Sequence, residues 1–291
     1  MKKFHSEFIT LRGLRTHVMH WGTPGSPKIF MLHGWMDVGA SFQFVVDCLK
    51  QDWHVIAPDW RGFGLTERSH ADCYWFADYL GDLDALLAHY SPDQAVNLLG
   101  HSMGGNVTSL YAGVRPHRVA KLVNLEGFGL PSTTPAQAPA RYAKWLDEIR
   151  QPPVMRPYAS RDEVAARLMK TNSRLLKERA YFLAGHWAAP DENGQWQILG
   201  DPAHKITSAI LYRTEEALAC WSAITAPVLW VEAEDTDIWR WMGPKETARQ
   251  EIDRRLQCIA DCRKAMIADA GHMLHHDQPQ ALAMLIEDFF C

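Results

Sequence analysis

One short run of this sequence, Gly100-His101-Ser102-Met103-Gly104, constrains the fold more than any other. It follows an apolar stretch, Ala95–Leu99, and precedes a helix-like segment, Asn106–Val114. A serine with glycines two residues before and after it is typical of a sharp strand-to-helix turn, because the neighbouring backbone comes too close for larger residues. Such a turn presents the hydroxyl above the sheet edge, beside the first amides of the helix. We therefore expect Ser102 to act as a nucleophile.

A glycine-rich turn that opens a helix also occurs at phosphate-binding sites. Those sites carry further signals, such as a Lys-Ser or Lys-Thr pair after the glycines or a G-x-G-x-x-G run between a strand and a helix. Neither signal accompanies a strand-to-helix turn in this chain. A nucleotide site is therefore not expected.

Short apolar runs recur along the chain and alternate with amphipathic stretches. The runs are Ile29–Leu32, His54–Ala57, Ala95–Leu99, Leu122–Leu125, Val228–Val231 and Ala265–Ala268. This alternation predicts an α/β fold with a mostly parallel sheet and helices on both faces. Two strand-like segments, Phe4–Leu11 and Leu14–His20, flank Arg12-Gly13 and predict an antiparallel hairpin at one edge of the sheet.

The alternation stops in a proline-rich stretch after about residue 131 and resumes after residue 223. Helix-like segments lie between these points, at Arg141–Arg150, Arg161–Met169 and Ser173–Gly185. We predict a helical lid formed by residues 131–223, inserted into a core formed by residues 1–130 and 224–291. Ligands of open α/β sheets bind at the carboxyl ends of the strands, so the lid is expected to cover that edge.

Charge and composition narrow the class of ligand. The chain has 34 acidic and 30 basic residues and no run of five or six like charges, so neither nucleic acid nor a membrane surface is an expected partner. We expect a small, largely uncharged substrate. The first residues lack a long apolar core and no stretch approaches ~18 apolar residues, which predicts a cytoplasmic protein. The six cysteines are scattered and predict reduced thiols and no metal site, while the oligomeric state stays open.

A serine nucleophile needs a base, and the base needs a partner that fixes its tautomer. His272 follows the last apolar run and is the expected base. Asp235 follows the preceding run and is the expected partner of His272. Two other carboxylates remain as alternatives, namely Asp237 and Glu126, which ends the strand after the nucleophile.

The oxyanion formed during acyl transfer needs two preorganised donors. We expect the backbone amide of Met103 to be one and that of Trp35 to be the other, because Gly34 permits a tight turn after the first parallel strand. The side chains expected to contact substrate are those of Trp35, His101, Phe128 and Trp187.

Several motifs resemble those of the α/β-hydrolase superfamily, over nearly the whole chain. They are His33-Gly34-Trp35, Asp59-Trp60-Arg61-Gly62-Phe63-Gly64, Gly100-His101-Ser102-Met103-Gly104-Gly105, Asp235 and Gly271-His272. The order Ser, Asp, His is also that of the superfamily. Gly34-Trp35-Met36-Asp37, together with Ala40-Ser41-Phe42, resembles the serine-hydrolase-like and epoxide-hydrolase-like branch. The resemblance implies a lid domain and no cofactor, and we interpret Asp59 and Arg61 as residues that fix a loop.

The residue at the nucleophile position separates activities within that branch. Epoxide hydrolases and haloalkane dehalogenases have an aspartate there, whereas this chain has Ser102. The leading hypothesis is therefore a carboxylesterase that forms an acyl-enzyme. Hydrolysis of a C–C bond in a ring-cleavage product is an alternative, for which lid arginines would bind a carboxylate. A non-catalytic ligand receptor on a hydrolase scaffold is another.

Overall fold

An eight-stranded sheet, ordered β1-β2-β4-β3-β5-β6-β9-β10, forms the centre of the computed structural model, which describes all 291 residues. The strands are β1 (Phe4–Leu11), β2 (Leu14–Trp21), β3 (Lys28–Leu32), β4 (His54–Pro58), β5 (Val96–His101), β6 (Val119–Leu125), β9 (Val228–Ala233) and β10 (Cys262–Ile267). β2 is antiparallel to both β1 and β4, and the other neighbours are parallel. The predicted α/β fold with an N-terminal hairpin is confirmed.

The turn of the hairpin is short because both of its residues adopt positive φ. Arg12 has φ 47° and Gly13 has φ 82°, which is the backbone of a two-residue hairpin turn whose twist matches that of the strands. The Arg12 guanidinium also donates to Asp82 Oδ1 at 3.0 Å and to the carbonyl of Asp78 at 2.8 Å. These hydrogen bonds join the edge of the sheet to helix α2 (Phe76–Tyr90).

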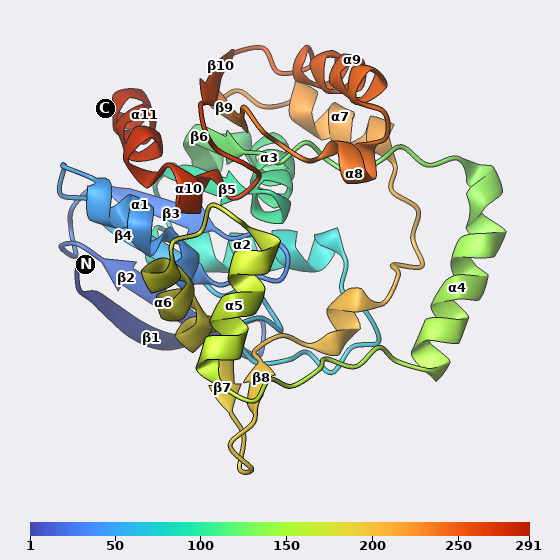
Figure 1. Ribbon diagram of the computed structural model, residues 1–291. Helices are drawn as coiled ribbons and strands as arrows, with labels where there is room; N and C mark the ends of the chain where they lie inside the picture. The colour runs from blue at the N-terminus through green and yellow to red at the C-terminus, as the bar shows by residue number, and fades with distance from the viewer.

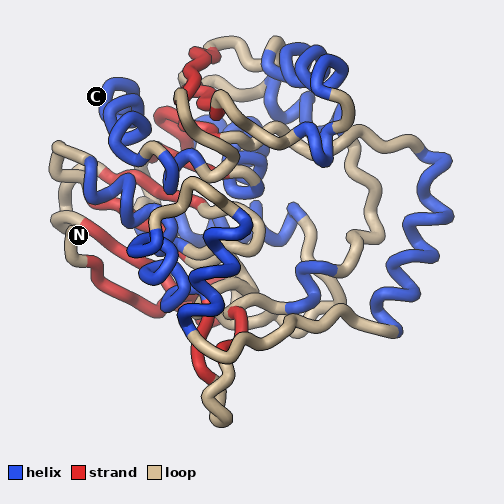
Figure 2. The backbone as a smooth tube through the Cα atoms, viewed as in Figure 1, coloured by secondary structure: helices blue, strands red, loops and turns tan.

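Helices cover both faces of the sheet (Figures 1 and 2). Alternate residues of β3 point to opposite faces: Phe30 and Leu32 belong to one buried cluster, and Ile29 and Met31 to another. The first cluster takes in side chains of α2, α3 (Met103–Val114), α7 (Thr214–Ser222) and α9 (Lys245–Leu256). The second takes in side chains of α1 (Gln43–Cys48) and α11 (Pro279–Phe290). Each face of the sheet thus has its own apolar core.

The chain between β6 and β9 contains three further helices and a small hairpin. They are α4 (Ala138–Arg150), α5 (Arg161–Thr171), α6 (Lys177–Trp187), β7 (Ala188–Pro190) and β8 (Trp196–Ile198). α5 and α6 share a buried cluster that also includes Phe44 of α1. α4, at the right of Figure 1, buries none of its residues. No helix combines the length and apolar character needed to cross a bilayer.

Helix α7 lies within the residues predicted to form the lid, 131–223, and packs against the core. Leu218 and Trp221 of α7 are buried in the same cluster as α3. The two helices approach so closely that a Cβ on Gly113 would lie 1.8 Å from the carbonyl oxygen of Cys220. The apolar face of α7 is therefore buried on α3, and the boundary of the lid at residue 223 stays a prediction.

Shorter elements join these pieces. They are the 3₁₀ turns η1 (Gly39–Phe42), η2 (Pro116–Arg118), η3 (Pro135–Gln137) and η4 (Pro202–Lys205), and the one-turn helices α8 (Trp239–Met242) and α10 (Leu274–Asp277). The loops that follow β3, β5, β6, β9 and β10 gather at the carboxyl edge of the parallel strands. That edge is where ligands of open α/β sheets bind.

Candidate active site

Ser102 sits on a strained turn between β5 and α3. Its backbone has φ 51° and ψ −113°, a conformation that a non-glycine residue rarely adopts. A Cβ on Gly100 would lie 2.3 Å from the carbonyl oxygen of Gly104, and one on Gly104 would lie 2.1 Å from that of Leu32. The two glycines are thus required by close backbone approach, as the sequence pattern predicts.

His272 lies beside Ser102, in the loop between β10 and α10. Its Nε2 is 2.9 Å from Ser102 Oγ. The ring of Trp241, in α8, stands edge-on to the imidazole with centroids 5.3 Å apart. Behind the imidazole, His101 Nε2 lies 2.8 Å from the backbone carbonyl of His272. The sequence placed His272 correctly next to the serine but gave no indication of Trp241.

Glu126 completes the line of hydrogen bonds. Its Oε2 is 3.2 Å from His272 Nδ1 and also accepts the hydroxyl of Thr236. Its Oε1 accepts the amide of Ala233 at 2.7 Å. The residue is buried and has φ 56°, so its backbone carries strain as Ser102 does. A carboxylate held by these donors fixes both the orientation and the tautomer of His272.

The prediction that Asp235 contacts His272 is wrong in this structure. The Asp235 carboxylate accepts a hydrogen bond from the Arg174 guanidinium at 2.6 Å, and its side chain is 54% exposed. Asp237 pairs instead with Arg240 at 3.1 Å. The alternative carboxylate, Glu126, occupies the place because β6 lies directly beside β5, so the residue after β6 emerges next to Ser102.

The loop after β3 runs against the nucleophile. A Cβ on Gly34 would be 3.3 Å from Ser102 Cβ, so the backbone that leads to Trp35 passes beside the serine. Met103 is the first residue of α3, which directs the amides at the start of that helix toward the same space. The Trp35 side chain is 52% exposed, and its indole donates to the carbonyl of His204 at 3.3 Å.

Two of the side chains predicted to contact substrate are buried, and their contact with substrate stays a prediction. His101 is 1% exposed and packs against His275, with the two rings tilted and their centroids 4.3 Å apart. Phe128 is 2% exposed and packs on Trp230 in the core. Trp187 is half-buried, and its indole donates to the carbonyl of Met36 at 2.6 Å; its contact with substrate stays a prediction.

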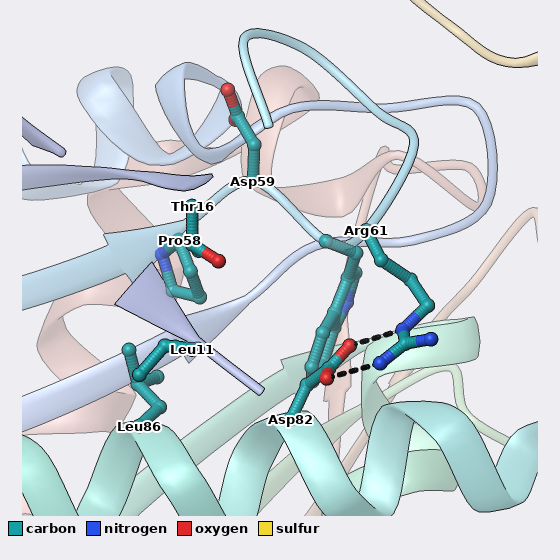
Figure 3. A pocket seen from close by; sticks show the side chains of 8 residues that line it. Leu11, Thr16, Pro58, Asp59, Arg61, Asp82 and Leu86 are labelled. Atoms are coloured by element: carbon teal, nitrogen blue, oxygen red, sulfur yellow. Dashed lines mark hydrogen bonds and ion pairs between the residues drawn. The ribbon is translucent and has the colours of Figure 1, made fainter. Parts of the chain in front are cut away.

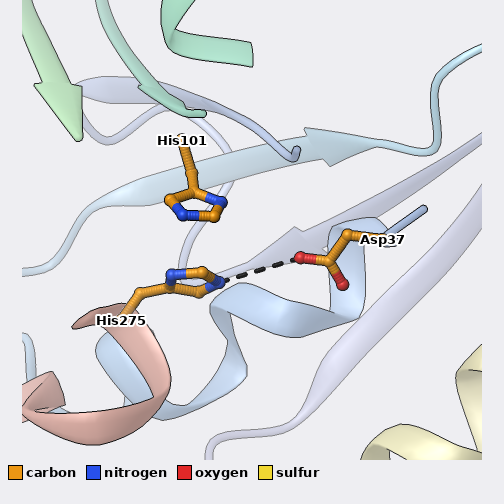
Figure 4. A group of neighbouring side chains, drawn as sticks. All are labelled: Asp37, His101 and His275. Atoms are coloured by element: carbon orange, nitrogen blue, oxygen red, sulfur yellow. Dashed lines mark ion pairs between the residues drawn. The ribbon is translucent and has the colours of Figure 1, made fainter. Parts of the chain in front are cut away.

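A buried polar cluster of Asp37, His101 and His275 supports the back of the site (Figure 4). Asp37 Oδ2 and His275 Nε2 are 3.8 Å apart. Burial raises the pKa of Asp37, but the neighbouring imidazoles of His275 and His276 outweigh it and bring the pKa to about 2. Burial, then repulsion from His275, holds the pKa of His101 well below 6.5, so His101 is neutral.

The same three side chains offer donor atoms that all lie within 4.8 Å of one another. Ligands of a tetrahedral zinc ion, with bonds of about 2.1 Å, are only about 3.4 Å apart. The Asp37 to His275 separation of 3.8 Å is wider than that. The expectation of no metal site stays a prediction.

Asp59 and Arg61 hold the loop after β4. Arg61 Nε and one terminal nitrogen each lie 2.5 Å from an oxygen of Asp82, while the Asp59 carboxylate points away from this pair (Figure 3). Asp59 accepts the backbone amides of Gly39 at 2.7 Å and Leu65 at 2.9 Å. These contacts agree with the interpretation of both residues as loop-fixing.

Comparison with known proteins is consistent with this architecture. A family model described as alpha/beta hydrolase fold matches residues 27–279. A serine hydrolase-like protein of Danio rerio is 25% identical over 92% of this chain and 83% of its own length, and serine hydrolase-like protein 2 of Homo sapiens is 24% identical over 92% and 88%.

Solved structures show the same fold. A thioesterase domain from the curacin biosynthetic pathway superposes with a TM-score of 0.86 at 23% identity, covering 98% of this chain and 99% of that domain. An esterase of Mycobacterium tuberculosis superposes with a TM-score of 0.74 at 18% identity, covering 99% and 92%.

Proposed function

Because the chain belongs to the α/β hydrolase family, we propose that it is a serine hydrolase acting on a small, largely uncharged carboxylic ester through an acyl-enzyme. One observation carries the proposal: Ser102 Oγ, His272 and the Glu126 carboxylate form a hydrogen-bonded line, with separations of 2.9 and 3.2 Å. This is the arrangement in which a histidine can remove the proton of a serine hydroxyl.

In the acylation step, Ser102 Oγ forms a bond to the carbonyl carbon of the ester and its proton passes to His272 Nε2. The bond to the leaving alcohol then breaks, and the alcohol takes that proton from His272. Water repeats the sequence on the acyl-enzyme, which releases the acid and restores Ser102. Glu126 serves as a positioning residue that stabilises the imidazolium of His272 formed in each half-reaction.

The oxyanion of each tetrahedral intermediate is assigned to the amides of Met103 and Trp35. Support for this assignment comes from the first turn of α3, where unpaired amides meet the positive end of the helix dipole. Further support comes from the loop at Gly34, which lies against Ser102. Each such donor typically contributes about 10²–10³ in kcat.

Exposed aromatic side chains favour an uncharged substrate. Trp35 is 52% exposed, and Trp241, which contacts His272, is 42% exposed. Arg174 reaches the loop of Asp235, but its charge is already paired with that carboxylate. C–C hydrolysis in which Arg174 binds a carboxylate would need this ion pair to open, which favours the ester.

The proposal is tested by steady-state hydrolysis of p-nitrophenyl esters with short to long acyl chains, comparing the intact protein with Ser102→Ala. Ser222→Ala is the matched control, because Ser222 is an exposed serine bonded only to the carbonyl of Leu218. We expect multiple turnovers in the intact protein and in the control, and a loss of at least about 10⁴-fold in Ser102→Ala. An intact protein no faster than Ser102→Ala would favour C–C hydrolysis or a receptor.

A further inference from the structure

A second serine, far from Ser102 along the chain, has its own histidine and carboxylate. Ser6 Oγ in β1 is 2.7 Å from His17 Nε2 in β2, and His17 Nδ1 is 2.8 Å from Asp59 Oδ2. We propose that Ser6, His17 and Asp59 form a second nucleophilic site, at which Ser6 accepts the acyl group of an activated ester in a single, self-acylating event. This site is independent of Ser102 and of the function proposed for it.

The carboxylate of the second site is preorganised. Asp59 is 3% exposed and accepts backbone amides of Gly39 and Leu65 as well as the imidazole. Burial raises the pKa of Asp59, but its hydrogen bond to His17 and the charge of His17 outweigh this effect and lower it overall. Asp59 is therefore an anion near neutral pH. Figure 3 shows its carboxylate directed away from the Arg61–Asp82 pair, so no arginine neutralises it.

The hydrogen bonds select the tautomer that a base needs. An ionised carboxylate only accepts, so Asp59 requires the proton on His17 Nδ1. Nε2 then carries the lone pair and accepts the Ser6 hydroxyl. The backbone amide of His17 donates to Thr66 Oγ1 at 2.9 Å, and its side chain is 3% exposed, which keeps the ring in place.

Ser6 is reachable and has apolar neighbours. It is exposed on β1, and Phe4 and Phe8 lie on the same side of the strand, two residues before and after it. These rings are 40% and 39% exposed. They offer a surface along which an acyl or aryl group can pack, so the fitting class of donor is an uncharged aryl ester.

The reaction balances without a further reactant. Ser6 Oγ forms a bond to the acyl carbon, its proton passes to His17 Nε2, and the aryloxide leaves and is protonated by His17. β1 continues to Leu11, so no helix begins after Ser6 to supply oxyanion donors. Because each missing donor costs about 10²–10³ in rate, the acyl-serine is expected to accumulate once instead of turning over.

The test uses Ser102→Ala, in which the active-site serine is absent. The protein is treated with p-nitrophenyl acetate, quenched at intervals, digested with trypsin and analysed by mass spectrometry. Ser6 falls in the tryptic peptide 4–12, Ser26 in 16–28 and Ser222 in 214–240. Ser26 is the matched control for a carboxylate without an imidazole, since its hydroxyl donates to Asp52 at 2.9 Å. Ser222 is the exposed serine without either group.

We expect Ser6 to be acetylated about 100-fold faster than either control serine, which is the lower range for general-base assistance. His17→Gln in the same background should bring Ser6 to the rate of the controls. The chain unfolded in urea provides a second measurement that does not depend on that variant folding, and the preference should vanish there. Equal rates in the folded protein, or a preference that survives unfolding, would overturn the proposal.

Discussion

Two serines of this protein meet a histidine and a carboxylate at similar distances but in different surroundings. At Ser102 the serine-to-histidine and histidine-to-carboxylate separations are 2.9 and 3.2 Å. At Ser6 the same two separations are 2.7 and 2.8 Å. Ser102 stands on a strained turn that begins α3, whereas Ser6 lies within a regular strand. The hydrogen bonds can prepare a nucleophile in both places, but only the turn also supplies amides for an oxyanion. The two proposals therefore expect turnover at Ser102 and a single acylation at Ser6.

The carboxylates at the two serines also differ in their surroundings. Glu126 follows β6 at the carboxyl edge of the sheet, in a backbone conformation with φ 56°. Asp59 follows β4 and accepts hydrogen bonds from the backbone amides of Gly39 and Leu65, so it holds their loops together. We propose that Glu126 positions a base, whereas Asp59 also ties loops of the fold to each other. Substitutions should therefore affect activity at the first and stability at the second.

Apart from Ser102 itself, the largest effect is expected for Glu126→Gln. An amide in place of the carboxylate loses the charge that stabilises the His272 imidazolium and the correct tautomer, which should lower kcat by about 10³–10⁴-fold. Asp235→Asn is the matched control, since Asp235 bonds Arg174 instead of His272, and kcat should change by less than about threefold. The measurement is the kcat and KM of both variants on the best p-nitrophenyl ester.

A purely structural role for Glu126 would lower the thermal stability of Glu126→Gln together with its kcat. If Glu126 acts through His272, the outcome differs. Thermal unfolding of Glu126→Gln should stay close to that of the intact protein, and Glu126→Asp should recover part of kcat because it restores the charge. A kcat that falls more in Asp235→Asn than in Glu126→Gln would instead support the aspartate as the partner of His272.

A smaller effect, on stability, is expected for Gly104→Ala in the turn of Ser102. The added Cβ would lie 2.1 Å from the carbonyl oxygen of Leu32, a backbone atom that cannot move alone. We expect a loss of about 3 kcal/mol in the free energy of unfolding and a loss of activity, because the turn must shift. Gly200→Ala is the control, since its Cβ would meet nothing closer than 3.5 Å.

Urea titration followed by tryptophan fluorescence measures both glycine variants. A Gly104→Ala protein as stable and as active as Gly200→Ala would show that the turn of Ser102 is not held by backbone contact.

The smallest effect is expected for Asp59→Asn, and it should depend on pH. The pKa of Asp59 is lowered in the folded protein from 3.8, so its stabilisation is present above that pH and is lost as the pH falls below it. We expect Asp59→Asn to lose about 2 kcal/mol of unfolding free energy at pH 7, the range for hydrogen bonds to a charged group. The deficit should shrink toward pH 3.

Urea titrations at several pH values check this prediction, with Asp147→Asn on the exposed face of α4 as the control. A deficit that is constant across the pH range would mean that the charge of Asp59 contributes nothing, which would also weaken the case for His17 as a base at Ser6.

Local patterns in the sequence predicted the strands and the serine turn well. The apolar runs marked each parallel strand, and the glycines around Ser102 marked the turn, because both depend on neighbours within a few residues. Glu126 was harder to choose, although it directly follows β6. Its identification needs the adjacency of β5 and β6, which no local pattern states.

Contacts between distant segments could not be read from the sequence. His101 and Phe128 were expected near substrate, but their side chains are buried against His275 and Trp230. α7 was assigned to the lid, although its apolar face packs on α3. In each instance the direction of a side chain, or of a helix face, depends on which element lies beside it.

The sequence by itself determined the α/β fold, the place of Ser102 and the choice of His272, because short-range sterics and periodic burial fix strands and tight turns. The tertiary structure alone decided which carboxylate meets His272, and it alone brought Ser6, His17 and Asp59 together from β1, β2 and the loop after β4. The physical reason is that a hydrogen bond reaches only about 3 Å, so partners far apart in the chain are chosen by strand order and packing.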